Sequence, residues 1–241
     1  MKGAFPKSIS NIEGPSIQSL SPETKNTWTL IFILFTASVI GSGIIVLADV
    51  MHNFWGYFLI WNLFLAWIPL GIAWFVRLRR LSNVALIALG NLWLLFFPNA
   101  PYLLTDLAHL RWLGMESSWL MVSIFILFAL TGLFVGLTSL MWMHLEIRER
   151  WGQVTGWIFV LVSLAASGFG VYIGRFLRFN SWDIFTDPLY VVFVIKEQLF
   201  SPQTFMHAWG FSLMFTLLTA FCYVMTQQMG QMSLNPAIQN Q

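Results

Sequence analysis

Six long stretches without a charged residue dominate this sequence. The 12 basic and 10 acidic residues all lie between these stretches or near the ends of the chain. Each stretch exceeds the roughly 20 apolar residues that an α-helix needs to cross the hydrocarbon core of a bilayer. The sequence therefore predicts an all-α integral membrane bundle with six transmembrane helices. The stretches are residues 27–48, 54–76, 81–101, 117–143, 153–174 and 204–226.

The scarcity of charged residues also indicates which kind of partner the chain contacts. Charged residues make up 9% of the chain, whereas an average soluble domain has about 25%. The formal net charge is only +2, and the basic residues form no stripe with interleaved aromatic residues, as a nucleic-acid-binding surface would require. We therefore expect contact with a lipid bilayer and none with nucleic acid.

The distribution of Lys and Arg predicts the orientation of the bundle. If the N-terminus is inside, the inner segments carry eight basic residues and the outer segments carry four, which agrees with the positive-inside rule. Both termini are then cytoplasmic. Residues 1–26 and 227–241 are polar and are expected to be disordered tails that flank a membrane domain at 27–226.

Two prolines lie near the outer end of the third stretch, in the segment FFPNAPYLLTDLAHL. Proline has no N–H and disfavours helical geometry in the residue before it, so the third span is expected to break near Pro98 and Pro101. A new helix would begin at Pro101 with Asn99 or Ala100 as its cap. Broken helices at membrane depth occur where they are buried in protein or line a cavity, and the second case makes Asn99 a candidate binding residue.

Asp106 and His109 follow the second proline and are three positions apart, so they share a helical face. We take them as candidate catalytic residues that would orient a substrate or transfer a proton, a role that suits histidine near neutral pH. Two ligands are too few for a metal ion. Asp183 or His207 would have to join them, and no metal site is predicted.

Arg175 and Arg178 lie in the segment GRFLRFNSWD at the outer end of the fifth span. Their spacing predicts a shared helical face, from which two guanidinium groups could hold a phosphate or carboxylate in bidentate fashion. Asn180 or Ser181 would end this helix or cap the next one, with Asp183 nearby. Arg175, Arg178, Asn180 and Asp183 are candidate binding residues. The alternative is structural: the arginines would extend to the lipid headgroups or pair with nearby aspartates.

Weaker patterns predict details of packing. Small residues every four positions in the fourth and fifth stretches favour close helix contacts within the bundle over a dimer motif. Asp187 and Pro188 predict the N-cap and first turn of a short helix that lies at the outer interface or covers a cavity.

Asn62 and Asn91 are polar positions within spans that could extend a site inward. HLEIRER at 144–150 is expected to be a solvated helix end on the inner face, with His144 solvated or interfacial.

The two motifs FPNAPYLLTDLAHL and GRFLRFNSWD together resemble a family of bacterial multi-pass membrane proteins known as domain of unknown function 1361. The resemblance covers roughly residues 30–226. It implies an integral protein of a bacterial cytoplasmic membrane and supplies no activity, cofactor or catalytic residue.

Three functions remain open on the sequence alone. The first is an outer-facing polar pocket that binds an anionic group, on a lipid or lipid-linked substrate. The second is a transporter or channel for a small solute, with a water-accessible path to Asn62 and Asn91. The third is a non-catalytic subunit that packs against a membrane-protein partner or a second copy. Common catalytic motifs such as G-x-S-x-G are absent, so whether the chain is an enzyme stays undecided, as does any cofactor.

Overall fold

The computed structural model describes residues 22–52, 56–79, 81–112, 119–201 and 204–233, and no strand occurs in these ranges. Nine α-helices and two shorter helical segments make up this described part. They are α1 Pro22–His52, α2 Tyr57–Leu78, α3 Asn83–Phe96, α4 Asn99–Asp106, η2 Leu107–Trp112, α5 Trp119–Trp151, α6 Gln153–Tyr172, η3 Ile173–Leu177, α7 Asp183–Thr186, α8 Pro188–Phe200 and α9 Phe205–Ser233.

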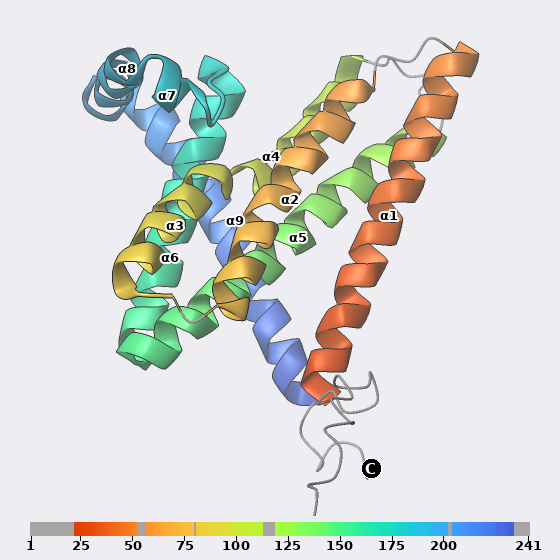
Figure 1. The fold of residues 1–241 in the computed structure, drawn as a ribbon. Coiled ribbons are helices and arrows are strands. Elements are labelled where there is room, and N and C mark those ends of the chain that lie inside the picture. The colour runs from red at the N-terminus through yellow and green to blue at the C-terminus, as the bar shows by residue number, and fades with distance from the viewer. Residues whose placement is uncertain (1–21, 53–55, 80, 113–118, 202–203, 234–241) are drawn as a thin grey trace, which may run out of the picture.

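Six helices within the described ranges are long and apolar enough to cross a membrane, as the sequence predicted. Figure 1 shows them as a bundle in which α1 begins and α9 ends at the same end. Helix α1 begins before residue 27 and α9 continues past residue 226. The rest of the two predicted tails, 1–21 and 234–241, lies outside the described residues, and their disorder stays a prediction.

Helix α5 forms the centre of the bundle and crosses behind α2 (Figure 1). One group of buried side chains joins α5 to α2, α3, α6 and α9 and includes Trp93, Leu140 and Met143. A second group joins α5 to α1, α2 and α4 and includes Leu103 and Phe128. The outer surface carries many exposed apolar side chains, such as those of α1. Such a surface is stable in contact with lipid tails and not with water.

HLEIRER forms the end of α5, which continues as far as Trp151. The prediction that His144 is solvated is wrong: its side chain is 2% exposed. Its Nδ1 atom lies 2.7 Å from the hydroxyl oxygen of Tyr223, which also accepts a hydrogen bond from Gln227 at 2.7 Å. A histidine on the fourth span therefore packs against the sixth, which its position in the sequence could not indicate.

An ion-pair network joins the last turns of α2 and α5. Glu146 accepts hydrogen bonds from Arg77 at 3.2 Å and from Arg150 at 2.7 Å. Arg77 also donates to Glu149 at 2.8 Å, and Arg150 donates to the Leu81 carbonyl oxygen at 2.9 Å. Arg77, Glu146, Glu149 and Arg150 are therefore paired with one another.

The short helix between the last two spans is present as α8. The Asp187 carboxylate accepts a hydrogen bond from the Tyr190 N–H at 3.2 Å, and Pro188 occupies the first turn, so the predicted cap is confirmed. At 1.5 Å per residue the helix is about 20 Å long, too short to cross the hydrocarbon core. Figure 1 shows it beside the start of α9 at the end of the bundle opposite the last residue of α9.

Candidate functional site

The third span bends between α3 and α4 without leaving helical geometry. Phe97 has φ −56° and ψ −37°, and Pro98 has φ −59° and ψ −23°. The Ala100 N–H bonds to the Phe97 carbonyl oxygen, three residues back, at 3.2 Å. The predicted break is therefore correct in place and wrong in form. Helix α4 begins at Asn99 and not at Pro101, because a tighter turn accommodates the two missing N–H groups.

This tighter turn leaves the Phe96 carbonyl oxygen without its usual partner, the N–H of Ala100. The side-chain amide of Asn99 replaces that partner, donating to the Phe96 oxygen at 2.8 Å and to the hydroxyl oxygen of Ser181 at 2.9 Å. Both amide hydrogens of Asn99 are thus engaged. Asn99 ties the bend in the third span to the segment that follows the fifth, and so brings the two sequence motifs together.

Small residues on neighbouring helices make room for α4. A Cβ atom on Gly170 of α6 would lie 2.6 Å from Cγ and 2.8 Å from Cβ of Pro98, and one on Gly136 of α5 would lie 2.6 Å from Cβ of Ala100. These are close contacts that only glycine permits. The predicted role of the small-residue repeats, packing within the bundle, is confirmed for these positions.

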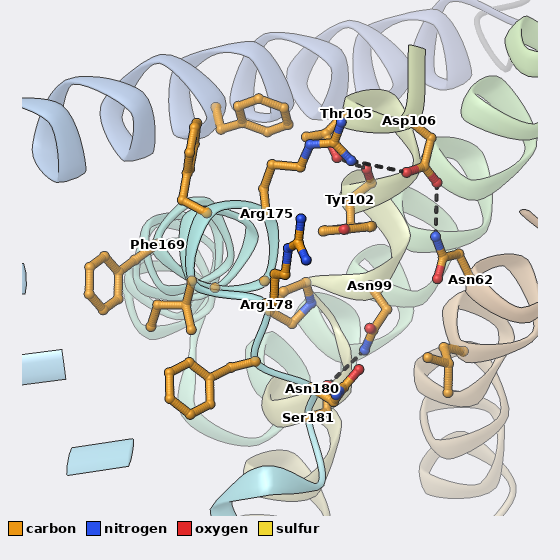
Figure 2. A pocket seen from close by; sticks show the side chains of 18 of the residues that line it. Asn62, Asn99, Tyr102, Thr105, Asp106, Phe169, Arg175, Arg178, Asn180 and Ser181 are labelled. Carbon is orange, nitrogen blue, oxygen red and sulfur yellow. Dashed lines mark hydrogen bonds and ion pairs between the residues drawn. The ribbon is translucent and has the colours of Figure 1, made fainter. Parts of the chain in front are cut away.

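The end of the fifth span departs from the predicted geometry. Helix α6 gives way to a π-helical turn at Ile173–Leu177, and Arg178 follows in the left-handed region at φ 60°, ψ 28°. Arg175 and Arg178 therefore do not share one α-helical face. A non-glycine residue in this region costs about 1–2 kcal/mol, and such strain is often found at functional sites. The side chains of both arginines still extend towards α4 (Figure 2).

Asn180 and Asp183 form a local turn. The Asn180 N–H donates to the Asp183 carboxylate at 2.7 Å, and the Asp183 N–H donates back to the Asn180 carbonyl oxygen at 3.0 Å. This reciprocal pair closes a turn immediately before α7, whose N-cap is Trp182, whereas Arg178 ends η3. Asn180 therefore caps neither helix, and the prediction of a cap at Asn180 is wrong. The carboxylate of Asp183 is therefore engaged in holding the turn.

Asp106 connects three helical segments. Its side chain is almost completely buried, with 1% of the residue exposed. Oδ2 accepts a hydrogen bond from the Asn62 amide of α2 at 2.9 Å, and Oδ1 lies 3.6 Å from a terminal nitrogen of Arg175 in η3. His109 lies on the other side, with Nδ1 3.1 Å from the Asp106 carbonyl oxygen and 3.7 Å from Oδ1. The contact with Arg175 is an ion pair and not a hydrogen bond, and Oδ1 has no hydrogen-bond partner among the described residues.

A cavity of about 1100 Å³ is lined by residues of both motifs. Figure 2 shows the side chains of Arg175 and Arg178 extending into the space between η3 and α4, where Asn99 and Tyr102 also lie. The polar residues around it come from α2, the third span and the end of the fifth. They are Asn62, Asn99, Tyr102, Thr105, Asp106, His109, Arg111, Arg175, Arg178, Asn180 and Ser181.

The cavity collects six of the seven predicted site residues and omits Asp183. Of the two span asparagines, Asn62 lines it, whereas Asn91 is exposed and donates to the Ile87 carbonyl oxygen of its own helix. Sequence reasoning missed Tyr102 and the aromatic wall formed by residues such as Phe169 and Phe211. Aromatic side chains are so frequent in this chain that no pattern distinguishes these from the others.

A comparison with family models shows which protein family the chain is related to. The model described as "Protein of unknown function (DUF1361)" matches residues 61–222, which include both motifs and all the residues of the cavity except Phe58. The chain belongs to the DUF1361 family. No curated protein and no solved structure matches the chain. For this DUF1361 protein, function must therefore be inferred from the site itself.

The DUF1361 site depends on Asn62 for its geometry, and replacing Asn62 by leucine should show this. The change removes the hydrogen bond to the buried Asp106 carboxylate, and a hydrogen bond to a charged group contributes about 1.5–3 kcal/mol. We expect a loss of that size in the free energy of unfolding, measured by denaturation in mixed micelles. The matched control is Asn91→Leu, which should change stability little because Asn91 bonds only its own helix. Equal effects of the two changes would contradict the role of Asn62.

Proposed function

We propose that this membrane protein binds an anionic group, carried by a lipid or lipid-linked substrate, at Arg175 and Arg178. One observation carries the proposal: two guanidinium groups extend into a cavity whose described lining includes one carboxylate, that of Asp106. Asp106 already lies near Arg175. Within the described part of the chain, no carboxylate pairs with Arg178. The positive charge of Arg178 is therefore available to a ligand.

The chemistry of arginine supports an anion with several oxygens. A guanidinium group presents a planar fork of donors that matches phosphate and carboxylate, and such charge-assisted bonds are stronger than neutral ones. Asp106, being buried, would orient Arg175, and His109 at the cavity wall would be the group placed to exchange a proton with the ligand. These roles for Asn99, Asp106, His109, Arg175, Arg178 and Asn180 are part of the proposal.

The cavity favours this function over the two alternatives. A purely structural subunit would hold the motif residues in a closed network, but a space of about 1100 Å³ lies between them. A solute path was expected to reach both Asn62 and Asn91, and only Asn62 lines the cavity. The location that we propose, the outer side of a bacterial cytoplasmic membrane, follows from the Lys and Arg distribution and the family resemblance.

Replacing Arg178 by glutamine tests the proposal. We expect the affinity for an anionic lipid to fall roughly tenfold to a hundredfold, because the change removes about 1.5–3 kcal/mol of charged hydrogen bonding. The measurement is the rise in unfolding temperature that phosphatidylglycerol produces in a neutral detergent, since a ligand that binds the folded state stabilises it. Arg178→Lys should retain part of the binding, because it keeps the charge and loses the fork.

The matched control is Lys196→Gln. Lys196 is an exposed cation on α8 that does not line the cavity, so the same loss of one charge there should leave the affinity unchanged. If folded Arg178→Gln protein bound phosphatidylglycerol as well as the wild type does, the anion-binding proposal would be wrong. A similar loss in both variants would indicate only a general effect of charge.

A further inference from the structure

The cavity has an apolar part that the anion site does not use. The wall on this side is formed by Ala166, Phe169 and Gly170 of α6 and by Ile173, the first residue of η3, which recur at helical spacing. From Arg175 this face extends about 13 Å along the helix, at 1.5 Å per residue. Helices α3 and α9 contribute further wall residues, which are likewise apolar: Leu94, Leu95, Phe211 and Phe215.

The direction of this apolar part matters. Arg175 lies at the end of the fifth span and Ala166 lies well inside it, so the wall runs from the polar end of the cavity towards the interior of the bundle. Apolar cavities do not hold water, because water finds no hydrogen-bond partners there. Within the thickness of a bilayer, the material that can fill such a space is hydrocarbon.

We infer that the ligand is an amphiphilic lipid whose anionic headgroup lies at Arg175 and Arg178 and one of whose hydrocarbon chains lies along α6. The inference rests on the proposed function and adds the class of substrate: a lipid of the bilayer and not a free anion. The positions of both the headgroup and the hydrocarbon chain are inferred from one cavity, which is polar beside the two arginines and apolar along residues 166–173, at the end of α6 and the start of η3.

Photo-cross-linking tests this arrangement directly. The full-length protein is reconstituted in phosphatidylcholine vesicles that contain phosphatidylglycerol with a diazirine in one acyl chain, and the cross-linked residues are identified by mass spectrometry. We expect cross-links concentrated at 166–173 and on the facing residues of α3 and α9. Cross-links spread evenly over the exposed apolar surface of the bundle would overturn the inference.

A pair of variants supplies the control. Ala166→Phe fills the apolar part, whereas Ala165→Phe places the same side chain at the neighbouring exposed position. The first should abolish cross-linking at 166–173, and the second should leave it unchanged. If Ala166→Phe does not fold, the wild-type map of cross-links still decides, because it depends on no substitution.

Two further measurements distinguish a failure of the lipid-chain inference from a failure of the proposed anion site. Soluble glycerol phosphate should compete poorly with the lipid if the chain contributes to binding, and equal competition would indicate a free anion as the ligand. If Arg178→Gln weakens binding while cross-links fall outside 166–173, the anion site stands and the chain inference is wrong. If Arg178→Gln leaves both unchanged, the proposed function itself fails.

Discussion

Replacing Gly170 by alanine is expected to lower the free energy of unfolding by about 1–3 kcal/mol, the usual cost of inserting an extra methyl group into a packed site. The added Cβ would lie 2.6 Å from Cγ and 2.8 Å from Cβ of Pro98. The proline ring is rigid and belongs to the backbone, so it cannot rotate away. Relief requires α4 to move from α6, which would also strain the bond between Asn99 and Ser181.

The control for this prediction is a glycine with empty space where a Cβ atom would lie. An added Cβ on Gly71 of α2 meets nothing within 4 Å, and alanine is a better helix former than glycine by up to about 1 kcal/mol. Gly71→Ala should therefore be neutral or stabilising. Both variants can be compared by thermal unfolding in the same detergent. Changes of the same sign and size would show that Gly170 is not needed for close packing.

Replacing Glu146 by glutamine should destabilise the opposite end of the bundle by about 2–3 kcal/mol. Breaking a fully buried ion pair costs about 3–5 kcal/mol, and the expected loss is smaller because the side chain of Arg77 is 33% exposed. Glu146 is the one acceptor that joins Arg77 of α2 to Arg150 of α5 among the described residues. Its loss leaves two cations near each other with one fewer compensating charge.

Glu149→Gln provides the comparison. The side chain of Glu149 is 55% exposed and pairs only with Arg77 in the described part of the chain, and exposed ion pairs contribute about 0–1 kcal/mol. Chemical denaturation of both variants in mixed micelles should therefore give a difference of at least about 1 kcal/mol between them. If Glu149→Gln were as destabilising as Glu146→Gln, burial would not determine the contribution of these pairs.

The six spans could be predicted from the sequence because the bilayer imposes a condition on each segment separately. A spanning segment must be apolar over its whole length and must satisfy its backbone hydrogen bonds internally. Local patterns also predicted the cap at Asp187 and the bend near Pro98, since capping and proline effects act within a few residues. The form of the bend was not predictable, because Asn99 depends on Ser181, far away in the sequence.

The sequence by itself determined the helical bundle, its apolar exterior and the rare polar residues available for a site. The tertiary structure alone decided how those residues are used. It placed Asn62 beside Asp106 and Asn91 on the exterior, buried His144 against Tyr223, and turned Arg178 into a left-handed conformation that faces α4. The physical reason is that each segment must be apolar enough to enter the bilayer whatever the other segments are. The hydrogen-bond partners of a polar side chain depend instead on how helices distant in the sequence pack together.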